Sequence, residues 1–185
     1  MKSFIILFLV VFIFQIQTQA AVLKSKSGFV KFIAVGKPGF LKIHGDSSSA
    51  KPEGFIQVKN DMLQGEFTFD LRSLKTGIDL RDEHMKNKYL EVSKFPNTKL
   101  VISSVAFKES DLIKDIKKDF SGYLTLHGVT KEIFGTVDYN GTLKKLFAKF
   151  KVELSDFAIA VPEHMGITVS KTADVEVSLE LEEKP

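Results

Sequence analysis

Apolar and polar residues alternate at every second position along most of this chain, and this period limits the fold more than any other feature. In a β-strand, successive side chains point to opposite faces, so an alternating run has one dry face and one wet face. The last run is the cleanest, because Val175, Val177, Leu179 and Leu181 alternate with Asp174, Glu176, Ser178, Glu180 and Glu182. Earlier runs lie at residues 30–34, 41–43, 67–72, 124–126, 133–137 and 146–154. The pattern predicts an all-β chain.

Turn-forming residues separate these runs. Proline, glycine, asparagine and aspartate mark turns at residues 37–39, 59–61 and 140–141. Asn140-Gly141, between two alternating runs, predicts a tight hairpin with a type I′ turn. Many consecutive antiparallel strands leave exposed edges unless the sheet closes into a barrel or packs against a second sheet, so we expect one of these two. Only residues 79–91 have helical spacing, and they predict a short helix across the flank or mouth of a barrel.

The first twenty residues have the order of a secretory signal peptide. Met1-Lys2 is a positive start, Phe4 to Phe14 is an unbroken apolar run, and Thr18-Gln19-Ala20 places small residues at a cleavage site. The run is too short to cross a bilayer, which takes about 20 apolar residues. We therefore expect cleavage after Ala20, a single mature domain at residues 21–185, and no transmembrane span after cleavage.

The composition excludes several classes of function. The chain has no cysteine, which excludes disulfides, thiol catalysis, cysteine metal sites and a lipid-modified cysteine. A formal net charge of +3 with dispersed lysines makes nucleic acid a poor partner, and we expect none. Export without cysteine favours the bacterial periplasm, with secretion as the alternative.

The densest polar segment covers residues 76–86 and contains Arg81, Asp82 and His84. The spacing of Asp82 and His84 matches no known metal motif, so we expect neither a metal nor a cofactor. A general acid–base site is an alternative, because such sites use a carboxylate or histidine held in an apolar cleft. An ordinary loop–helix junction is a further alternative, in which Asp79 caps the helix and Arg81 and Asp82 form local ion pairs.

Apolar volume is the remaining clue. Thirteen phenylalanines follow residue 20, and there is no tryptophan. A barrel of about eight strands has an interior just wide enough either to fill with side chains or to hold one ligand. Large residues such as Phe67 and Phe150 share the inward positions with small ones such as Ala34 and Ala148. This mixture is compatible with both a packed core and a ligand cavity.

Two blocks of sequence resemble the signatures of the YceI-like proteins. The first block comprises Phe69-Asp70-Leu71-Arg72-Ser73-Leu74-Lys75-Thr76-Gly77, Arg81-Asp82-Glu83-His84-Met85, Tyr89-Leu90-Glu91 and Lys94-Phe95-Pro96-Asn97. The second is Gly122-Tyr123-Leu124-Thr125-Leu126-His127-Gly128-Val129-Thr130-Lys131. Two elements depart from the family pattern. Residues 154–159 lack the arginine and glycine of the family's Arg-Ser-Asp-Phe-Gly-Ile element, and Leu100 replaces a phenylalanine. These changes indicate a divergent branch.

The resemblance implies an extended lipocalin-like antiparallel barrel of about eight strands, with a short helix around residues 79–91. It also implies a periplasmic binding protein that holds a long isoprenoid lipid, of the quinone or polyprenyl phosphate type, for transport, storage or envelope stress protection. On this hypothesis the protein is not an enzyme. The lipid tail is expected to contact Phe67, Phe69, Leu71, Leu100, Ile102, Leu124, Leu126, Phe150 and Val177, and the head to lie at one mouth near Arg81, Asp82 and His84.

Two other functions stay open. A ligand-free structural or interaction barrel of the envelope predicts a solid core and an exposed apolar patch. A barrel enzyme that uses Arg81, Asp82 and His84 predicts polar groups that converge in a buried site. Transient contact with a membrane or an envelope protein is compatible with all three functions, and the sequence leaves the oligomeric state open.

Overall fold

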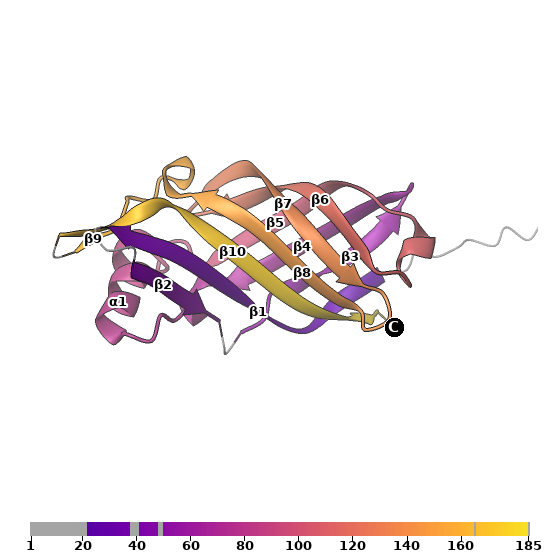
Figure 1. The fold of residues 1–185 in the computed structure, drawn as a ribbon, viewed down its shortest axis with the longest axis horizontal. Helices are drawn as coiled ribbons and strands as arrows, with labels where there is room; N and C mark the ends of the chain where they lie inside the picture. Colours follow the sequence, from indigo (N-terminus) through magenta and orange to yellow (C-terminus); the bar gives the residue numbers. More distant parts are fainter. Residues whose placement is uncertain (1–21, 38–40, 48–49, 165, 185) are drawn as a thin grey trace, which may run out of the picture.

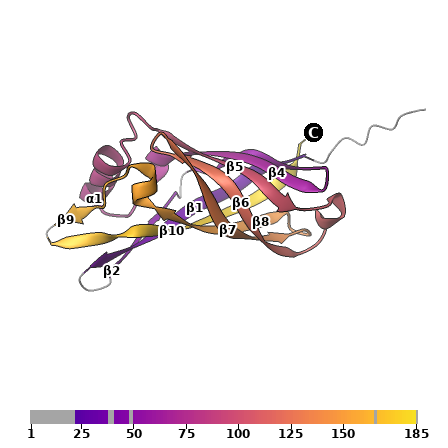
Figure 2. The ribbon, with the colours of Figure 1, turned by 90° about the horizontal axis from the view of Figure 1, so that it is seen from above.

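Eight strands form a closed antiparallel barrel in the computed structural model (Figures 1 and 2). The structure describes residues 22–37, 41–47, 50–164 and 166–184. They are β1 (Val22–Lys37), β3 (Glu53–Lys59), β4 (Met62–Asp70), β5 (Asn97–Ala106), β6 (Ile116–Leu126), β7 (Val129–Asn140), β8 (Lys145–Glu153) and β10 (Ile167–Glu183). Each pairs with the next in this order, and β10 returns to β1. The predicted all-β, eight-stranded barrel is confirmed. The predicted signal peptide lies outside the described residues.

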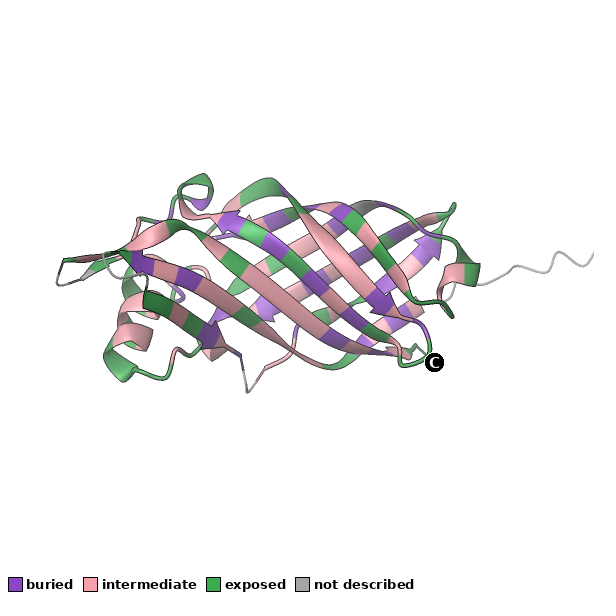
Figure 3. Cartoon of the chain, viewed as in Figure 1, coloured by how far each residue is buried: buried purple, intermediate pink, exposed green. Residues whose placement is uncertain are grey.

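Alternation sets which side chains enter the barrel. In β8, Leu146, Ala148, Phe150 and Val152 are buried, whereas Lys145, Lys149 and Lys151 are exposed. The same alternation of buried and more exposed positions runs along β4 and β6 (Figure 3), whereas it is less regular along β1 and β10, whose pairing contains register shifts. Strands such as β4, β6 and β8 therefore contribute every second residue to the interior, as the sequence period predicts.

Two short strands extend one end of the barrel beyond the ring of eight. β2 (Leu41–Asp46) pairs with β1, and β9 (Glu163–His164) pairs with β10. One edge of β1 is thus shared, because residues 22–24 pair with β3 and residues 31–36 pair with β2. The far end of β2 joins the segment after β4 through two backbone hydrogen bonds between Asp46 and Lys75, of 2.9 and 2.8 Å. At this end the wall therefore contains β2 between β1 and the segment after β4.

Two buried serines fill the interval along β1 between β3 and β2. Ser47 is 1% exposed, and its hydroxyl accepts a hydrogen bond from Val30 N (2.9 Å) and donates one to Ala50 O (2.8 Å). The hydroxyl of Ser25 accepts from Gly54 N at 3.0 Å. These side chains satisfy backbone groups that strand pairing leaves open, since an unpaired buried amide destabilises the fold.

The connection between β4 and β5 carries the helical segment. It comprises η1 (Leu71–Ser73), α1 (Asp79–Glu83) and η2 (His84–Tyr89). The helix predicted for residues 79–91 is present, but it ends at Tyr89 and its second half is a π-helix, in which Leu90 N donates to Met85 O. The N-cap position is Ile78, which provides no capping side chain, so the predicted cap at Asp79 is wrong. None of the helices in the described ranges is long and apolar enough to cross a bilayer.

The predicted type I′ turn at Asn140-Gly141 is also wrong. Residues 141–144 form a longer turn, and its left-handed residue is Lys144, with a φ of 50°. Gly141 serves close packing instead, because a Cβ there would lie 2.3 Å from the backbone of Ile113 and Lys114. Two-residue turns with both φ values positive occur at Asn60-Asp61 and at His127-Gly128.

The barrel end opposite α1 is packed by side chains. Phe107 and Tyr139 meet edge to face with ring centroids 6.1 Å apart, and Ile56 lies beside them in the core. The Tyr139 hydroxyl donates to Leu112 O at 3.0 Å, and burial raises the pKa of this tyrosine. This end also carries η3 (Glu109–Asp111) and the C-terminus (Figure 1). The interior is therefore closed at one end.

Candidate functional site

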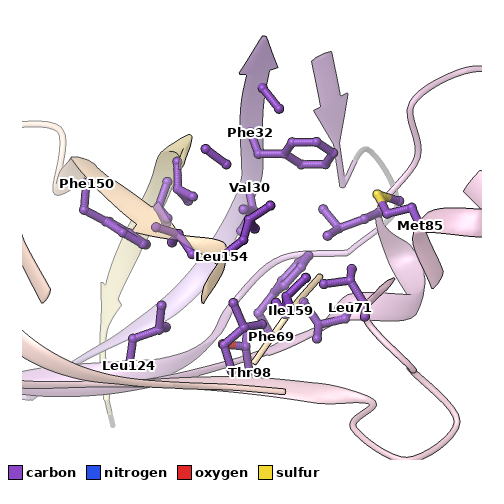
Figure 4. A pocket seen from close by; sticks show the side chains of 18 of the residues that line it. Val30, Phe32, Phe69, Leu71, Met85, Thr98, Leu124, Phe150, Leu154 and Ile159 are labelled. Atoms are coloured by element: carbon purple, nitrogen blue, oxygen red, sulfur yellow. The ribbon is translucent and has the colours of Figure 1, made fainter. Parts of the chain in front are cut away.

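A cavity of about 510 Å³ occupies the rest of the barrel interior. Side chains from β1, β4, β6 and β8 and from the helical connection converge on it (Figure 4). Its inner limit is set by residues such as Leu63, Val105 and Leu146, below which the closed end is packed. Several lining residues that point inward, including Leu100 and Val177, are only half-buried, because they face the cavity and not another side chain. The size lies within the range of ligand pockets, about 300–1,000 Å³.

All nine residues predicted to contact a lipid tail line this cavity. They are Phe67, Phe69, Leu71, Leu100, Ile102, Leu124, Leu126, Phe150 and Val177. Eight of them lie in strands, where alternation places them on the inward face, and Leu71 begins η1 directly after β4. Whether they contact a ligand stays a prediction.

Other lining residues were missed. Val30 and Phe32 belong to an alternating run of β1, so the same period indicates them. Leu154 ends the alternating run at residues 146–154 and begins η4 (Leu154–Phe157), so the period indicates it as well. Ile159 follows η4 and lines the cavity without any strand periodicity to reveal it. Met85 enters from η2. Ile159 and Met85 can be assigned to the cavity only from the tertiary arrangement.

The cavity lining is almost entirely apolar. Among the described residues that line it, the polar side chains are Thr76, Arg81, His84, Tyr89, Thr98 and Glu163. The Thr98 hydroxyl is already bonded to the carbonyl of Thr125, at 2.8 Å. Tyr89 reaches β9, because its hydroxyl accepts from Glu163 N at 3.3 Å. Apart from Thr98, all of these lie on the helical connection or β9, at the end of the barrel that β2 and β9 extend (Figures 1 and 2).

Arg81 and Asp82 do not form the local ion pairs that the junction alternative predicts, within the part of the chain that the structure describes. Both instead bind Thr76, whose hydroxyl accepts from Arg81 Nε (2.8 Å) and donates to an Asp82 carboxylate oxygen. The same oxygen accepts from Thr76 N at 2.7 Å, and Arg81 Nη2 donates to Thr76 O at 2.7 Å. Arg81 and His84 line the cavity, whereas Asp82 does not. Asp82 therefore holds the turn at residues 76–82, and a role for it beside a lipid head group stays a prediction.

His127, in the second signature block, braces the wall outside the cavity. Its Nε2 lies 2.9 Å from Glu91 Oε2, its Nδ1 lies 3.1 Å from Phe157 O, and Phe95 packs edge-on against its ring. Each ring nitrogen therefore has one hydrogen-bond partner. Hydrogen bonds from Lys94 and then from His127 lower the pKa of Glu91. The cluster ties the segment before β5 to the β6–β7 turn and to η4.

The described residues offer no group of three or more histidine, aspartate or glutamate side chains placed to hold a metal ion. A closed antiparallel barrel around one large apolar cavity is a lipocalin-like barrel. Within that class, the chain belongs to the YceI-like family, because residues 20–181 match the YceI-like domain.

Relatives in sequence come from pseudomonads. A UPF0312 protein of Pseudomonas savastanoi pv. phaseolicola is 36% identical over 117 residues, which cover 58% of this chain and 56% of that protein. A UPF0312 protein of Pseudomonas putida strain W619 is 32% identical over 149 residues, which cover 68% and 73% of the two chains. The chain thus spans about half the length of the first of these relatives.

Solved structures share the fold at low sequence identity. A polyisoprenoid binding domain from Saccharophagus degradans, implicated in plant cell wall breakdown, superposes with a TM-score of 0.66 at 16% identity, over 90% of this chain and 100% of that one. BcnA of Burkholderia cenocepacia has a TM-score of 0.62 at 17% identity, over 83% and 96% of the two chains.

Proposed function

We propose that this protein binds one long isoprenoid lipid inside its barrel, with the tail along the cavity and the head at the open end. The observation that carries the proposal is the apolar cavity of about 510 Å³, closed at one end by packed side chains. The family supports the lipid class, since a protein of the same fold is a polyisoprenoid binding domain. The ligand is of the quinone or polyprenyl phosphate type.

Burial of the tail drives binding. Each CH₂ group removed from water contributes about 0.8 kcal/mol, so a tail of several isoprene units has a large gross driving force. Ordering the flexible tail offsets part of this gain, and the net affinity is well below the sum. The lining residues come from all around the barrel, including Val30, Phe69, Leu124 and Phe150 (Figure 4). A tail in this space is surrounded on every side.

The head group lies near Arg81 and His84. Arg81 uses Nε and Nη2 to bind Thr76, and this fixes its guanidinium beside the cavity. A fixed guanidinium suits a phosphate or carbonyl oxygen, which accepts hydrogen bonds from it. Near this end the lining combines a positive charge with apolar walls, so it complements an amphipathic lipid that has a polar head and an apolar tail.

The alternatives have less support. A ligand-free structural barrel predicts a solid core, and that prediction is wrong because the interior holds a large cavity. A barrel enzyme needs Arg81, Asp82 and His84 to converge on a substrate, but Asp82 is bound to Thr76 outside the cavity lining. Binding without catalysis is therefore the function we propose, in the periplasm after export, as carrier, store or protector of the lipid.

Native mass spectrometry of protein purified from a bacterial periplasm, followed by organic extraction, tests the proposal. We expect a co-purifying isoprenoid. A Phe69→Asp variant places a carboxylate in the cavity wall and should lose the lipid, because burial of a charge in an apolar site is costly. The matched control is Phe134→Asp, since Phe134 lies on the outer wall and is 69% exposed.

The outcomes separate clearly. Loss of lipid in Phe69→Asp and its retention in Phe134→Asp, with both variants folded by circular dichroism, support the proposal. Wild-type protein that carries no lipid and takes up neither an added isoprenoid quinone nor a polyprenyl phosphate would overturn it.

A further inference from the structure

Three large apolar side chains surround the open end of the cavity and are exposed to solvent. Leu41, Ile78 and Leu80, here called the mouth rim, are 49%, 53% and 54% exposed, and all three also line the cavity. Among the described lining residues, the one other exposed side chain is Glu163. Apolar side chains that line a cavity and also face water mark its opening.

The mouth rim comes from two segments far apart in sequence. Leu41 begins β2, whereas Ile78 and Leu80 lie at the start of α1. The Asp46–Lys75 backbone bonds join these two segments, and α1, β2 and β9 gather at the same end of the barrel (Figures 1 and 2). Bringing exposed apolar residues together from separate elements is typical of an interaction surface.

We propose that the mouth rim is a docking face that inserts into the surface of a phospholipid bilayer. The inference rests on the proposed function, because a long isoprenoid tail is almost insoluble and must pass between membrane and cavity without crossing water. A rim that is continuous with the cavity lining provides an apolar path for it. Inserting the exposed part of each rim side chain into the interface also removes apolar surface from water.

The charges beside the rim favour an anionic lipid surface on the β2 side. Lys37 ends β1, Lys42 is the second residue of β2, and both are exposed and form no ion pair with another described residue. On the barrel wall, by contrast, lysines such as Lys99 and Lys149 are paired with carboxylates of neighbouring strands at 2.8 Å. A basic side chain near an anionic membrane surface is attracted to it.

On the helix side of the mouth rim, acidic and basic side chains are mixed. Asp79 and Glu83 of α1 are exposed there, close to Leu80 in sequence, and Lys86 and Lys88 follow in η2. The two acidic and two basic side chains balance, so the attraction to anionic lipid comes from Lys37 and Lys42. Docking therefore combines apolar insertion by all three rim residues with electrostatic attraction on one side, and it weakens only in part at high salt.

Flotation of the purified protein with vesicles of phosphatidylcholine, with and without phosphatidylglycerol, tests this inference. We expect Leu41→Ser plus Leu80→Ser to weaken partitioning by about tenfold per leucine, from the apolar area each exposes. We expect Lys37→Gln plus Lys42→Gln to weaken it by about fivefold per lysine, and only on vesicles with phosphatidylglycerol. The matched control is Ile113→Ser plus Leu143→Ser, because both residues are exposed away from the cavity.

Uptake of an isoprenoid quinone and of a polyprenyl phosphate from detergent micelles, measured on the same proteins, separates this inference from the proposed function. Uptake of either lipid without vesicle binding, or rim variants that bind vesicles as wild type does, would overturn the docking face and leave the proposed function intact. Vesicle binding that needs the rim, with uptake of neither lipid, would support the docking face and overturn the proposed function.

Discussion

Replacing Ala148 by phenylalanine should obstruct the inner part of the cavity, because Ala148 is the next inward-facing residue of β8 after Leu146. Ala148 lies on β8 between Val137 of β7 and Val177 of β10, and all three face the cavity. Displacing one isoprene unit, about five carbons at roughly 0.8 kcal/mol each, removes up to about 4 kcal/mol of burial energy. Because a shortened tail is also less ordered, we expect affinity to fall by about tenfold to a hundredfold.

The assay is competitive binding of a polyprenyl phosphate, with urea denaturation of each variant alongside. Ala148→Leu should give an intermediate loss, so the series is graded by side-chain size. The control is Ala106→Phe, the same change at an exposed position of β5, and it should bind as wild type does. If Ala148→Phe remains folded and binds within about twofold of wild type, the tail does not pass this point and the reasoning is refuted.

Two further predictions concern stability. Ser47→Ala leaves the Val30 amide without its acceptor and should lower the free energy of unfolding by about 1–3 kcal/mol in urea, whereas Ser110→Ala, at an exposed site, should change it by less than about 0.5 kcal/mol. Equal effects of the two changes would contradict the role of Ser47. Glu91 has a pKa below its usual value of 4.5, so its contribution to stability is complete above that pH and is lost as pH falls through the lowered pKa. Glu91→Gln should therefore have a lower free energy of unfolding than wild type at neutral pH, and this difference should shrink on acidification below about pH 4.5. A difference in unfolding free energy that does not change with pH would exclude this linkage.

Much of the barrel follows from the two-residue period, because that period alone decides which side chains face inward. The buried positions of β8 are the predicted ones, and so are Phe67 and Phe69 of β4. The sharing of one edge of β1 between β3 and β2 has no local signal, since Leu41–Asp46 alternates like any other strand. Ser47 lies in a run of serines that reads as a turn, and only the tertiary arrangement makes it a buried partner of Val30.

The candidate site was predictable to the extent that strands build it. Phe67 and Phe150 follow from alternation, whereas Ile159 lies outside any regular element and gave no signal. The bonds of Asp82 to Thr76 could not be predicted, because the charge of Asp82 and its place in a polar segment do not show what it binds. Composition likewise left open whether the interior is filled, since that depends on how the side chains of eight strands fit together.

Closure of the ring by β1 and β10 also governs when the fold can form. These strands come from opposite ends of the described chain, with Leu23 opposite Glu183, and they have the longest pairing in the barrel. Pairing so distant in sequence makes folding slow, because a long loop must close before the contacts form. Until β10 is available, β1 keeps an open edge, and open edges promote aggregation. Circular permutation that joins the paired ends and opens the β7–β8 turn would make this closure local and should speed folding.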